Sequence, residues 1–315
     1  MSKYAERILR EFPVRRKSGE KERFRLWLMG TLQELGYHAA LQSRETALSL
    51  GASTTNVIAG DPEKAKLLLI AHYDTGIRPL LPPLVMPTRP VTALLYLALT
   101  PVCVLLGSFA ASFALTFALD APHVTLPLFL ALLAAALCYL RFGPSETRNA
   151  DDNTSGVAAL LETAAALTPR YRGEVAFAFL DGGFGGLAGA KGFRARYPSA
   201  KEKVVVNVNC VAAGDELLIL PSRSARWNGE VLDAMLESFD VGGAKPVFLK
   251  TDGLTYYPSD NRAFRSSFAV CASKKLRGFG RIIEPRKSES IDSGNIEILK
   301  KSLCKLAENI PVSSS

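Results

Sequence analysis

Two long apolar runs separated by four residues constrain this 315-residue chain more than any other feature. The first run, from Val91 to Leu119, contains no charged residue and is longer than the ~20 residues that cross a hydrocarbon core. The second run, from Val124 to Leu140, is also uncharged and lies at the short end of the ~17–25 residue range. We therefore predict two membrane-spanning helices.

The link between the runs, Asp120 to His123, is so short that the two helices must be antiparallel. Both ends of the remaining chain then lie on one side of the membrane. Arg89 precedes the first run and Arg141 follows the second, whereas the link has no Lys or Arg, so the positive-inside rule places the soluble domain in the cytoplasm. The prediction is a multi-pass membrane protein whose hairpin, residues 91–141, contacts the lipid bilayer.

Alternatives to this hairpin leave the soluble part unchanged. A buried helical pair is disfavoured because soluble cores rarely contain charge-free helices of this length. A re-entrant second helix would change only the topology. Pro101 and Pro127 are expected to kink the helices, since neighbouring groups can satisfy the freed carbonyls. A transporter built on the hairpin is disfavoured because neither run contains a charged residue for an ion pathway.

The formal charge of +8 is spread along the soluble part and does not gather into a basic stripe with interleaved aromatic residues. We therefore expect no nucleic-acid partner, and favour anionic lipid near the membrane as the partner for part of this charge. The five cysteines are odd in number and form no CxxC pair, which argues against a disulfide framework. The N-terminus lacks the apolar stretch of a secretory signal, as expected for a domain in the reducing cytoplasm.

Outside the hairpin, residues 1–90 and 142–315 alternate short apolar β runs with amphipathic helical patterns, which predicts an α/β domain. Strands are predicted at 66–74, 174–181 and 203–209, with weaker candidates at 216–220 and 268–273. Helices are predicted at 20–35, 155–167, 187–197, 229–239 and 295–308. In open α/β sheets the chemistry gathers at the carboxyl ends of the strands, which is where His72, Asp74, Gly183 and Asn209 fall.

Five motifs occur in a recognisable order: AHYDT from Ala71, NADDNTSG from Asn149, FLDGGFGG from Phe179, VNVNC from Val206 and YPSDNRAF from Tyr257. Together they resemble the co-catalytic di-zinc aminopeptidases, a family that includes bacterial leucyl aminopeptidases, glutamate carboxypeptidases and the non-peptidase transferrin receptor. The resemblance spans nearly the whole soluble part. It implies a three-layer αβα domain with a mixed sheet, here interrupted by the transmembrane hairpin.

The resemblance assigns roles to three acidic or imidazole side chains that this chain retains. His72 matches a zinc ligand, and Asp74 matches the carboxylate that orients it and fixes the imidazole tautomer. Asp152 matches the ligand that bridges two zinc ions, with the adjacent Asp151 as the less favoured choice.

Other positions of the family pattern carry no suitable ligand in this chain. Gly183 stands in place of the general base, and Phe184 in place of a glutamate ligand. The later aspartate is Asn209, whose neutral amide is a weaker oxygen donor. The block at 281–299, which normally carries the last histidine ligand, has no histidine, and Glu284 is a disfavoured substitute.

A catalytic zinc normally keeps three protein ligands and one open position. By this count, zinc is possible only at one weakened site made by His72, Asp152 and, doubtfully, Asn209. We therefore predict a pseudopeptidase with an incomplete di-zinc site that binds a peptide or protein near the membrane. The alternative is an active zinc-dependent exopeptidase with a reduced or unconventional metal site.

Overall fold

The computed structural model describes residues 2–45, 53–184, 186–242, 245–285 and 289–311. Its strands are β1 (Ala39–Glu45), β2 (Ser53–Ala59), β3 (Leu67–His72), β4 (Val175–Leu180), β5 (Val204–Val208), β6 (Glu216–Pro221), β7 (Val247–Leu249), β8 (Ser267–Leu276) and β9 (Gly280–Ile282). Its helices are α1 (Lys3–Glu11), α2 (Ser18–Glu34), α3 (Pro90–Ala118), α4 (Thr125–Phe142), α5 (Ser155–Ala166), α6 (Ala188–Arg196), α7 (Arg223–Arg226), α8 (Gly229–Phe239) and α9 (Ser293–Asn309).

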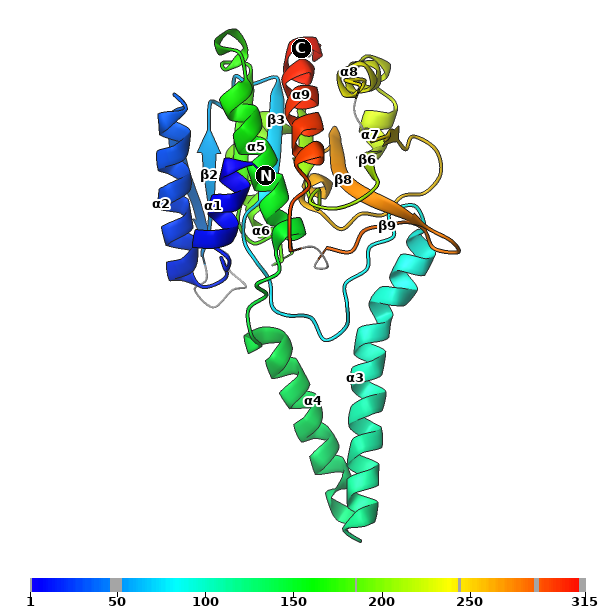
Figure 1. Ribbon diagram of the computed structural model, residues 1–315. Coiled ribbons are helices and arrows are strands. Elements are labelled where there is room, and N and C mark those ends of the chain that lie inside the picture. The colour runs from blue at the N-terminus through cyan, green and yellow to red at the C-terminus, as the bar shows by residue number, and fades with distance from the viewer. Residues whose placement is uncertain (1, 46–52, 185, 243–244, 286–288, 312–315) are drawn as a thin grey trace.

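The strands form one mixed sheet in the order β1-β2-β4-β3-β5-β8-β6-β7, with β9 paired to β8. The central strands β4, β3, β5 and β8 are mutually parallel, whereas β2 and β6 run antiparallel to their central neighbours. Consequently the carboxyl ends of β3, β4 and β5 lie at the same edge of the sheet. In Figure 1 this edge faces the hairpin formed by α3 and α4.

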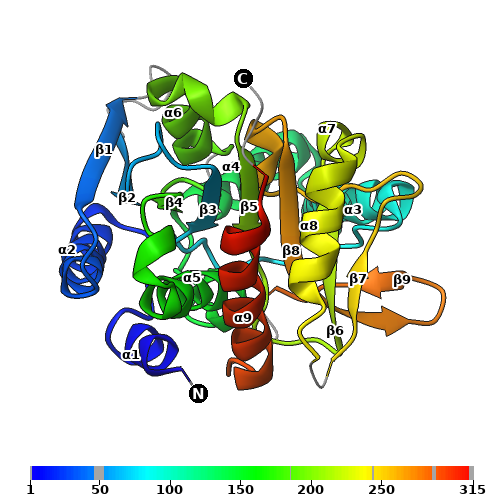
Figure 2. The same ribbon diagram turned by 90° about the horizontal axis from the view of Figure 1, so that it is seen from above.

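Alternating side chains of each central strand enter two separate cores, because successive residues of a strand point to opposite faces. In β3, Leu67, Leu69 and Ala71 pack on the face covered by α1, α2, α5, α8 and α9. Leu68 and Ile70 pack on the other face, with residues of α6. Figure 2 shows the three resulting layers from above. The α/β fold with a mixed sheet and helices on both faces confirms the predicted fold class.

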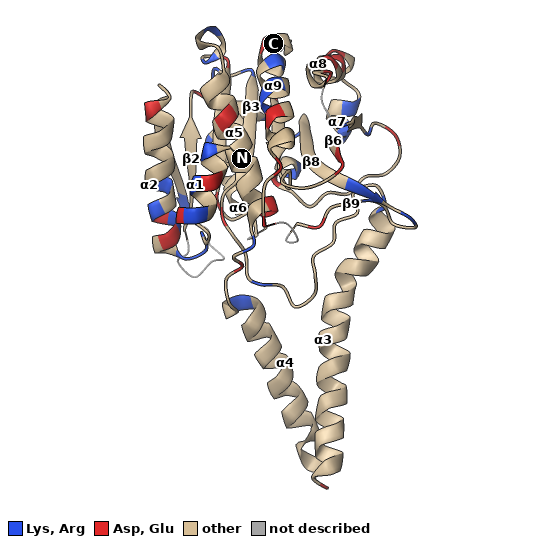
Figure 3. Cartoon of the chain, viewed as in Figure 1, with Lys and Arg blue, Asp and Glu red and all other residues tan. Residues whose placement is uncertain are grey.

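The two apolar runs form α3 and α4, which project away from the sheet as a hairpin (Figure 1). Their mean hydropathies are 2.1 and 2.0, and none of the most apolar stretch of either helix is buried inside the protein. Near the tip the Thr125 hydroxyl donates to the Thr116 hydroxyl at 2.9 Å, and Phe109 packs edge-on against Phe129. Both helices are therefore long and apolar enough to cross a membrane, and Figure 3 shows them nearly free of charge.

The chain leaves the sheet after β3 to enter the hairpin and returns from the hairpin directly before α5. The two connecting segments pair with each other: the amide of Arg78 donates to the carbonyl of Pro144 at 2.9 Å, and that of Glu146 to the carbonyl of Gly76 at 3.0 Å. The hairpin is thus rooted at the carboxyl edge of the sheet.

All five strand predictions and all five helix predictions for the soluble part coincide with observed elements to within a few residues. Sequence reasoning missed the antiparallel pair β1 and β2, the short strands β7 and β9, and the N-terminal helix α1. The pair β1 and β2 was missed because polar residues interrupt the apolar alternation of both strands.

Candidate metal centre

Strand ends and one helix start bring three of the predicted site residues into contact. His72 is the last residue of β3, Asp74 follows it, and Asp152 lies directly before α5. The Nε2 atom of His72 lies 3.1 Å from Oδ1 of Asp152, within hydrogen-bond distance. Its Nδ1 atom lies 3.4 Å from Oδ1 of Asp74, an ion-pair contact without good hydrogen-bond geometry. Both His72 and Asp74 are buried, with 4% exposure.

The two carboxylates change the protonation of this imidazole. Burial disfavours the charged form of His72, but contacts with Asp152 and Asp74 outweigh burial and raise its pKa well above the ordinary value. Burial also opposes ionisation of Asp74, and His72 and Lys21 overcome it and lower the pKa of that carboxyl. The two acidic side chains therefore favour the protonated form of His72.

Gly183 lies directly against this imidazole. A Cβ atom at this position would lie 2.9 Å from Cγ and 3.0 Å from Nδ1 of His72, closer than side chains normally approach. The amide of Gly183 donates to Oδ1 of Asp74 at 3.0 Å, which holds the glycine backbone close to the cluster. The ring of Phe184 packs edge-on against the imidazole, with ring centroids 5.5 Å apart. The position matched to the general base thus has no room for a longer side chain while His72 keeps this rotamer.

Asn209 directs its amide toward other polar groups. Its Nδ2 atom donates to the hydroxyl of Ser259 at 3.0 Å, and its Oδ1 atom accepts from the thiol of Cys210 at 3.4 Å. Asn207 donates to the same Ser259 hydroxyl at 2.5 Å. Asn209 therefore belongs to a hydrogen-bonded group with Asn207, Cys210 and Ser259. The hydrogen bonds of its side chain do not reach His72 or Asp152.

Three other acidic residues, Asp151, Asp181 and Glu284, have structural partners. Asp151 accepts from the amide of Ala212 at 2.6 Å, and burial raises its pKa well above the ordinary value. Asp181 forms a 2.5 Å ion pair with Lys21 and accepts from the amide of Thr55 at 3.1 Å. Glu284 forms an ion pair with Lys274.

Sequence reasoning missed a buried arginine behind the cluster. Arg15 is fully buried, and its guanidinium donates to the carbonyls of Tyr73 at 2.5 Å and Phe12 at 2.7 Å and to the hydroxyl of Thr154 at 2.9 Å. Burial lowers its pKa to about 10, while Asp74 and Asp152 oppose that shift, so the side chain remains charged near neutral pH. Arg15 therefore supplies positive charge to a buried group of carboxylates.

Asp260 is the second residue that was missed, although it lies in the quoted YPSDNRAF motif. It is 1% exposed, and its Oδ1 atom has no hydrogen-bond partner among the described residues. Burial raises its pKa to about 6, with His72 opposing the shift and Asp74 and Asp152 adding to it. The pKa of Asp260 therefore depends on the charges of His72, Asp74 and Asp152. The sequence gives no reason to expect this interaction, because Asp260 lies 186 residues after Asp74.

The residues present do not fit a two-zinc centre. Among the described residues, no three His, Cys, Asp or Glu side chains are arranged so that they could hold one metal ion. His72 and Asp152 form a pair of candidate ligands, and the region expected to carry the last histidine lies partly outside the described residues, at 286–288. His38, the histidine that sequence reasoning did not weigh, is exposed beside edge strand β1, at the opposite end of the sheet.

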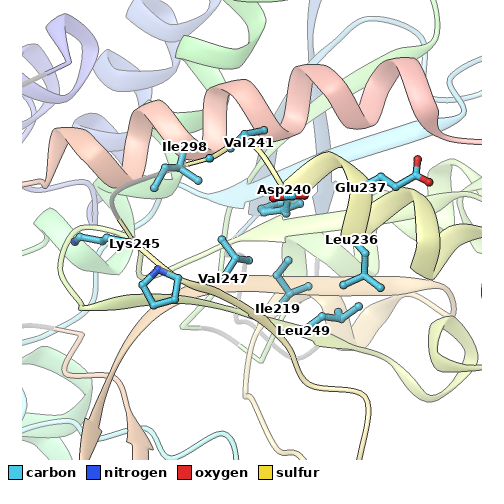
Figure 4. Close-up of a pocket in the computed structure, with 12 residues that line it drawn as sticks. Ile219, Leu236, Glu237, Asp240, Val241, Lys245, Val247, Leu249 and Ile298 are labelled. Atoms are coloured by element: carbon cyan, nitrogen blue, oxygen red, sulfur yellow. The ribbon is translucent and has the colours of Figure 1, made fainter.

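A separate cavity of about 610 Å³ lies between α8, α9 and strands β6 and β7 (Figure 4). Aliphatic side chains, among them Ile219, Leu236 and Ile298, point into it, while Lys245 lies at one end. None of the predicted site residues lines this cavity, so it is distinct from the candidate metal centre.

One segment of the chain matches a known family. Residues 139–272 match peptidase family M28, a stretch that includes Asp152, Gly183, Asn209 and Asp260 but not His72. The chain has no significant match among curated protein sequences.

Solved structures share the fold over almost their full length. A glutaminyl cyclase from Porphyromonas gingivalis is 15% identical, with 97% of this chain and 95% of that chain covered and a TM-score of 0.58. A Zn-dependent exopeptidase from Parabacteroides distasonis is 14% identical, with coverage of 97% and 96% and a TM-score of 0.59. A leucine aminopeptidase precursor from Bacteroides thetaiotaomicron is 14% identical, with coverage of 97% and 94% and a TM-score of 0.57.

The resemblance inferred from the five motifs is therefore confirmed: residues 139–272 match peptidase family M28, and the chain has the same fold as solved structures of a Zn-dependent exopeptidase, a leucine aminopeptidase precursor and a glutaminyl cyclase.

Proposed function

We propose that this chain is a membrane-anchored pseudopeptidase, which binds a peptide or protein partner beside the bilayer without cleaving it. One observation carries the proposal: His72 packs on Gly183, the position matched to the general base. A general base at that position would have to displace the imidazole, and no third His, Cys, Asp or Glu of the described residues joins His72 and Asp152 as a metal ligand. The buried Arg15 adds positive charge that further disfavours a cation at this place.

The position of the site supports a partner at the membrane surface. His72 ends β3, at the edge of the sheet that faces the hairpin (Figure 1), and Asp152 follows α4 in the segment that returns from the hairpin. A partner that enters this edge therefore approaches between the domain and the bilayer. In this proposal the α/β domain lies on the cytoplasmic side, because arginines lie at the root of the hairpin and not at its tip.

Zinc content and activity of the full chain test this proposal. After chelator washing, purified protein in detergent is expected to hold well under one zinc ion per chain and to release no amino acid from aminoacyl-anilide substrates. The double variant Gly183→Glu, Phe184→Glu is also expected to be inactive, since the new Cβ at position 183 overlaps His72 and the other ligands are still missing. Two tightly held zinc ions, or cleavage by the double variant, would overturn the pseudopeptidase assignment.

A second candidate is an active exopeptidase with a single, unconventional zinc site. The adjacency of His72 and Asp152 favours it, as does the fold shared with a Zn-dependent exopeptidase. This candidate predicts about one zinc per chain and cleavage that disappears in both His72→Ala and Asp152→Ala. If the parent protein neither holds zinc nor cleaves substrate, the exopeptidase candidate is excluded and the binding function is left.

Partner binding is tested by crosslinking in cells. A photoreactive amino acid at position 184, which is 45% exposed beside His72, is expected to form adducts with a discrete partner. The same probe at Arg170, an exposed position at the other end of the sheet, serves as the control. Equal adduct patterns at the two positions would contradict a binding role for this edge.

Thiol labelling tests the proposed orientation. Cysteine at Trp227, which is 84% exposed on the α/β domain, should react with an impermeant reagent only from the cytoplasmic side. Cysteine at His123, in the link at the hairpin tip, should react only from the other side. Labelling of both from one side would exclude a hairpin that spans the membrane.

A further inference from the structure

The two helices of the hairpin differ in length where they meet the domain. At ~1.5 Å per residue, the 29 residues of α3 extend about 43 Å and the 18 residues of α4 about 27 Å, against a hydrocarbon core of about 30 Å. Because the helices meet at the tip, the first turns of α3 extend beyond the end of α4, as Figure 1 shows. These turns, residues 90–100, therefore fall at the boundary between acyl chains and headgroups.

A proline-rich segment lies beside these turns. Residues 79–85, here called the proline loop, contain Pro79, Pro82 and Pro83. Proline has no amide hydrogen, so three of the backbone donors that would be costly at membrane depth are missing. Tyr96 of α3 donates to the carbonyl of Pro82 at 2.7 Å, and Tyr139 of α4 donates to the carbonyl of Arg78 at 3.2 Å. Tyrosine is typical of membrane interfaces, and these two tether the loop at that depth.

An apolar cavity of about 240 Å³ opens between the proline loop and the first turns of α3. Apolar cavities of about 150 Å³ are large enough to bind benzene. The lining is mostly hydrocarbon, with the prolines of the proline loop on one side and Ala93, Tyr96 and Leu97 of α3 on the other. A cavity of this kind at the acyl-chain boundary is more favourably filled by hydrocarbon than by water.

Two arginines flank this cavity in the chain. Arg78 directly precedes the proline loop and Arg89 directly precedes α3; both are exposed. Neither guanidinium forms a hydrogen bond or ion pair within the described part of the chain. The nearby acids are outnumbered by basic residues: Glu146 accepts from the amide of Arg148 and faces its guanidinium at 3.8 Å, and Glu284 pairs with Lys274. The net charge of these groups together with Arg78 and Arg89 is therefore positive.

We propose that this cavity binds one acyl chain of an anionic phospholipid, whose phosphate is held by Arg78 and Arg89. The inference rests on the proposed membrane anchoring by the hairpin and goes beyond it, because it assigns a specific lipid site to one side of α3. Bound lipid would also hold the proline loop in place, and this loop lies in the segment that connects His72 to α3. The lipid site thereby adjoins the path by which a partner would reach the candidate metal centre.

Photocrosslinking of the full chain in nanodiscs tests this inference. The probe is phosphatidylglycerol with a diazirine on one acyl chain, diluted into phosphatidylcholine. Adducts are expected to concentrate in residues 79–85 and 93–100, and Ala93→Leu, which fills the cavity, is expected to reduce them several-fold. Ala98→Leu makes the same change at an exposed position of α3 outside the cavity and is the matched control.

Competition between lipids tests the two arginines. Arg78→Gln and Arg89→Gln should each lower the labelling preference for phosphatidylglycerol over phosphatidylcholine by about fivefold, the contribution of one arginine near an anionic membrane surface. Arg170→Gln should leave this preference unchanged. Adducts spread evenly around α3 and α4, or equal labelling of the Ala93 and Ala98 variants, would overturn the lipid site while leaving membrane anchoring intact. A chain that fails to enter nanodiscs at all would instead refute the anchoring.

Discussion

The candidate metal centre and the hairpin depart from the usual arrangement of a soluble protein in opposite ways. The centre buries charge, with Arg15, His72 and Asp74 all at 4% exposure or less. The hairpin exposes hydrocarbon, with Leu106 at 65% and Phe117 at 82% exposure. Both arrangements are costly in water unless something compensates for them.

The compensation comes from different sources in the two regions. In the centre it is internal, because His72 contacts both Asp74 and Asp152 and the guanidinium of Arg15 adds positive charge. In the hairpin the described chain supplies little compensation, because most apolar side chains of α3 and α4 are left exposed. The comparison teaches that the charges of the centre are compensated within the chain, whereas the hairpin presents apolar surface that is long enough to cross a membrane. Four measurements test this contrast.

Removing the buried cation should have the largest effect. Arg15→Met leaves the carbonyls of Phe12 and Tyr73 without their guanidinium donor and removes positive charge from the centre, and should destabilise the α/β domain by about 3–5 kcal/mol, since each unsatisfied buried acceptor costs about 1–3 kcal/mol. Urea unfolding in detergent, followed by the fluorescence of Trp27, measures the loss. Arg10→Met, at an exposed arginine, should change stability by less than about 1 kcal/mol. Equal effects of the two substitutions would show that the centre does not depend on Arg15.

A charge on the hairpin should be nearly as costly, but in a different assay. Leu106→Arg, near the middle of α3, should disfavour membrane insertion by about 2.5–3.5 kcal/mol. The fraction of chains inserted during synthesis on microsomes reports this. Leu26→Arg is the matched control, because Leu26 of α2 has almost the same exposure, 64%, on the α/β domain. If Leu106→Arg inserts like the parent chain, α3 does not lie in hydrocarbon.

The protonation of Asp260 sharpens the contrast within the centre. Its pKa of about 6 lies above the ordinary value of 3.8, so the folded state holds this proton more tightly than the unfolded state. The resulting stability is fully present below pH 3.8 and is lost as the pH rises through about 6. Asp260→Asn cannot ionise and should be more stable than the parent at pH 7 by about 2–3 kcal/mol. The urea concentration at the unfolding midpoint should therefore fall less steeply between pH 4 and 7 in the variant than in the parent. Parallel pH dependences of the two proteins would contradict the raised pKa of Asp260.

The smallest effect concerns the contact between glycine and imidazole. Gly183→Ala places a methyl group 2.9 Å from Cγ of His72 and should cost about 1–3 kcal/mol, as overpacking of a core does. Gly173→Ala, where nothing lies within 4 Å of the new atom, should cost less than 1 kcal/mol and is the control. An unchanged stability of the Gly183 variant would mean that His72 readily leaves its present rotamer and that the centre can open.

Local patterns predicted the parts of the fold that are strongly periodic. Strand β3 was found because its apolar run is buried on both faces, and α5 because its small and apolar residues repeat with helical spacing. Strand β1 was not found, since it is an edge strand in which Gln42, Ser43 and Arg44 interrupt the apolar pattern. Edge strands depend on a partner strand, and the register of β1 with β2 is not visible in either segment alone.

For the candidate centre, sequence alone named the residues at each position and could not say how they are used. The resemblance identified His72 and Asp152, yet only the folded chain brings their side chains to 3.1 Å. Arg15 lies 59 residues before Asp74, and Asp260 lies 186 residues after it, so no local pattern links them to the cluster. Arg15 and Asp260 interact electrostatically with Asp74 and Asp152 only because separate segments of the chain converge at one edge of the sheet.

The sequence by itself determined two properties: an uncharged hairpin long enough to cross a membrane, and the absence of a carboxylate at Gly183, Phe184 and Asn209, where the resemblance predicts one. Both are properties of side-chain type and run length, which no folding can alter. Tertiary structure decided that His72 rests on Gly183, that Arg15 lies behind the carboxylates and that the cluster faces the hairpin. These depend on distances between segments remote in sequence, and such distances are set only when the sheet assembles.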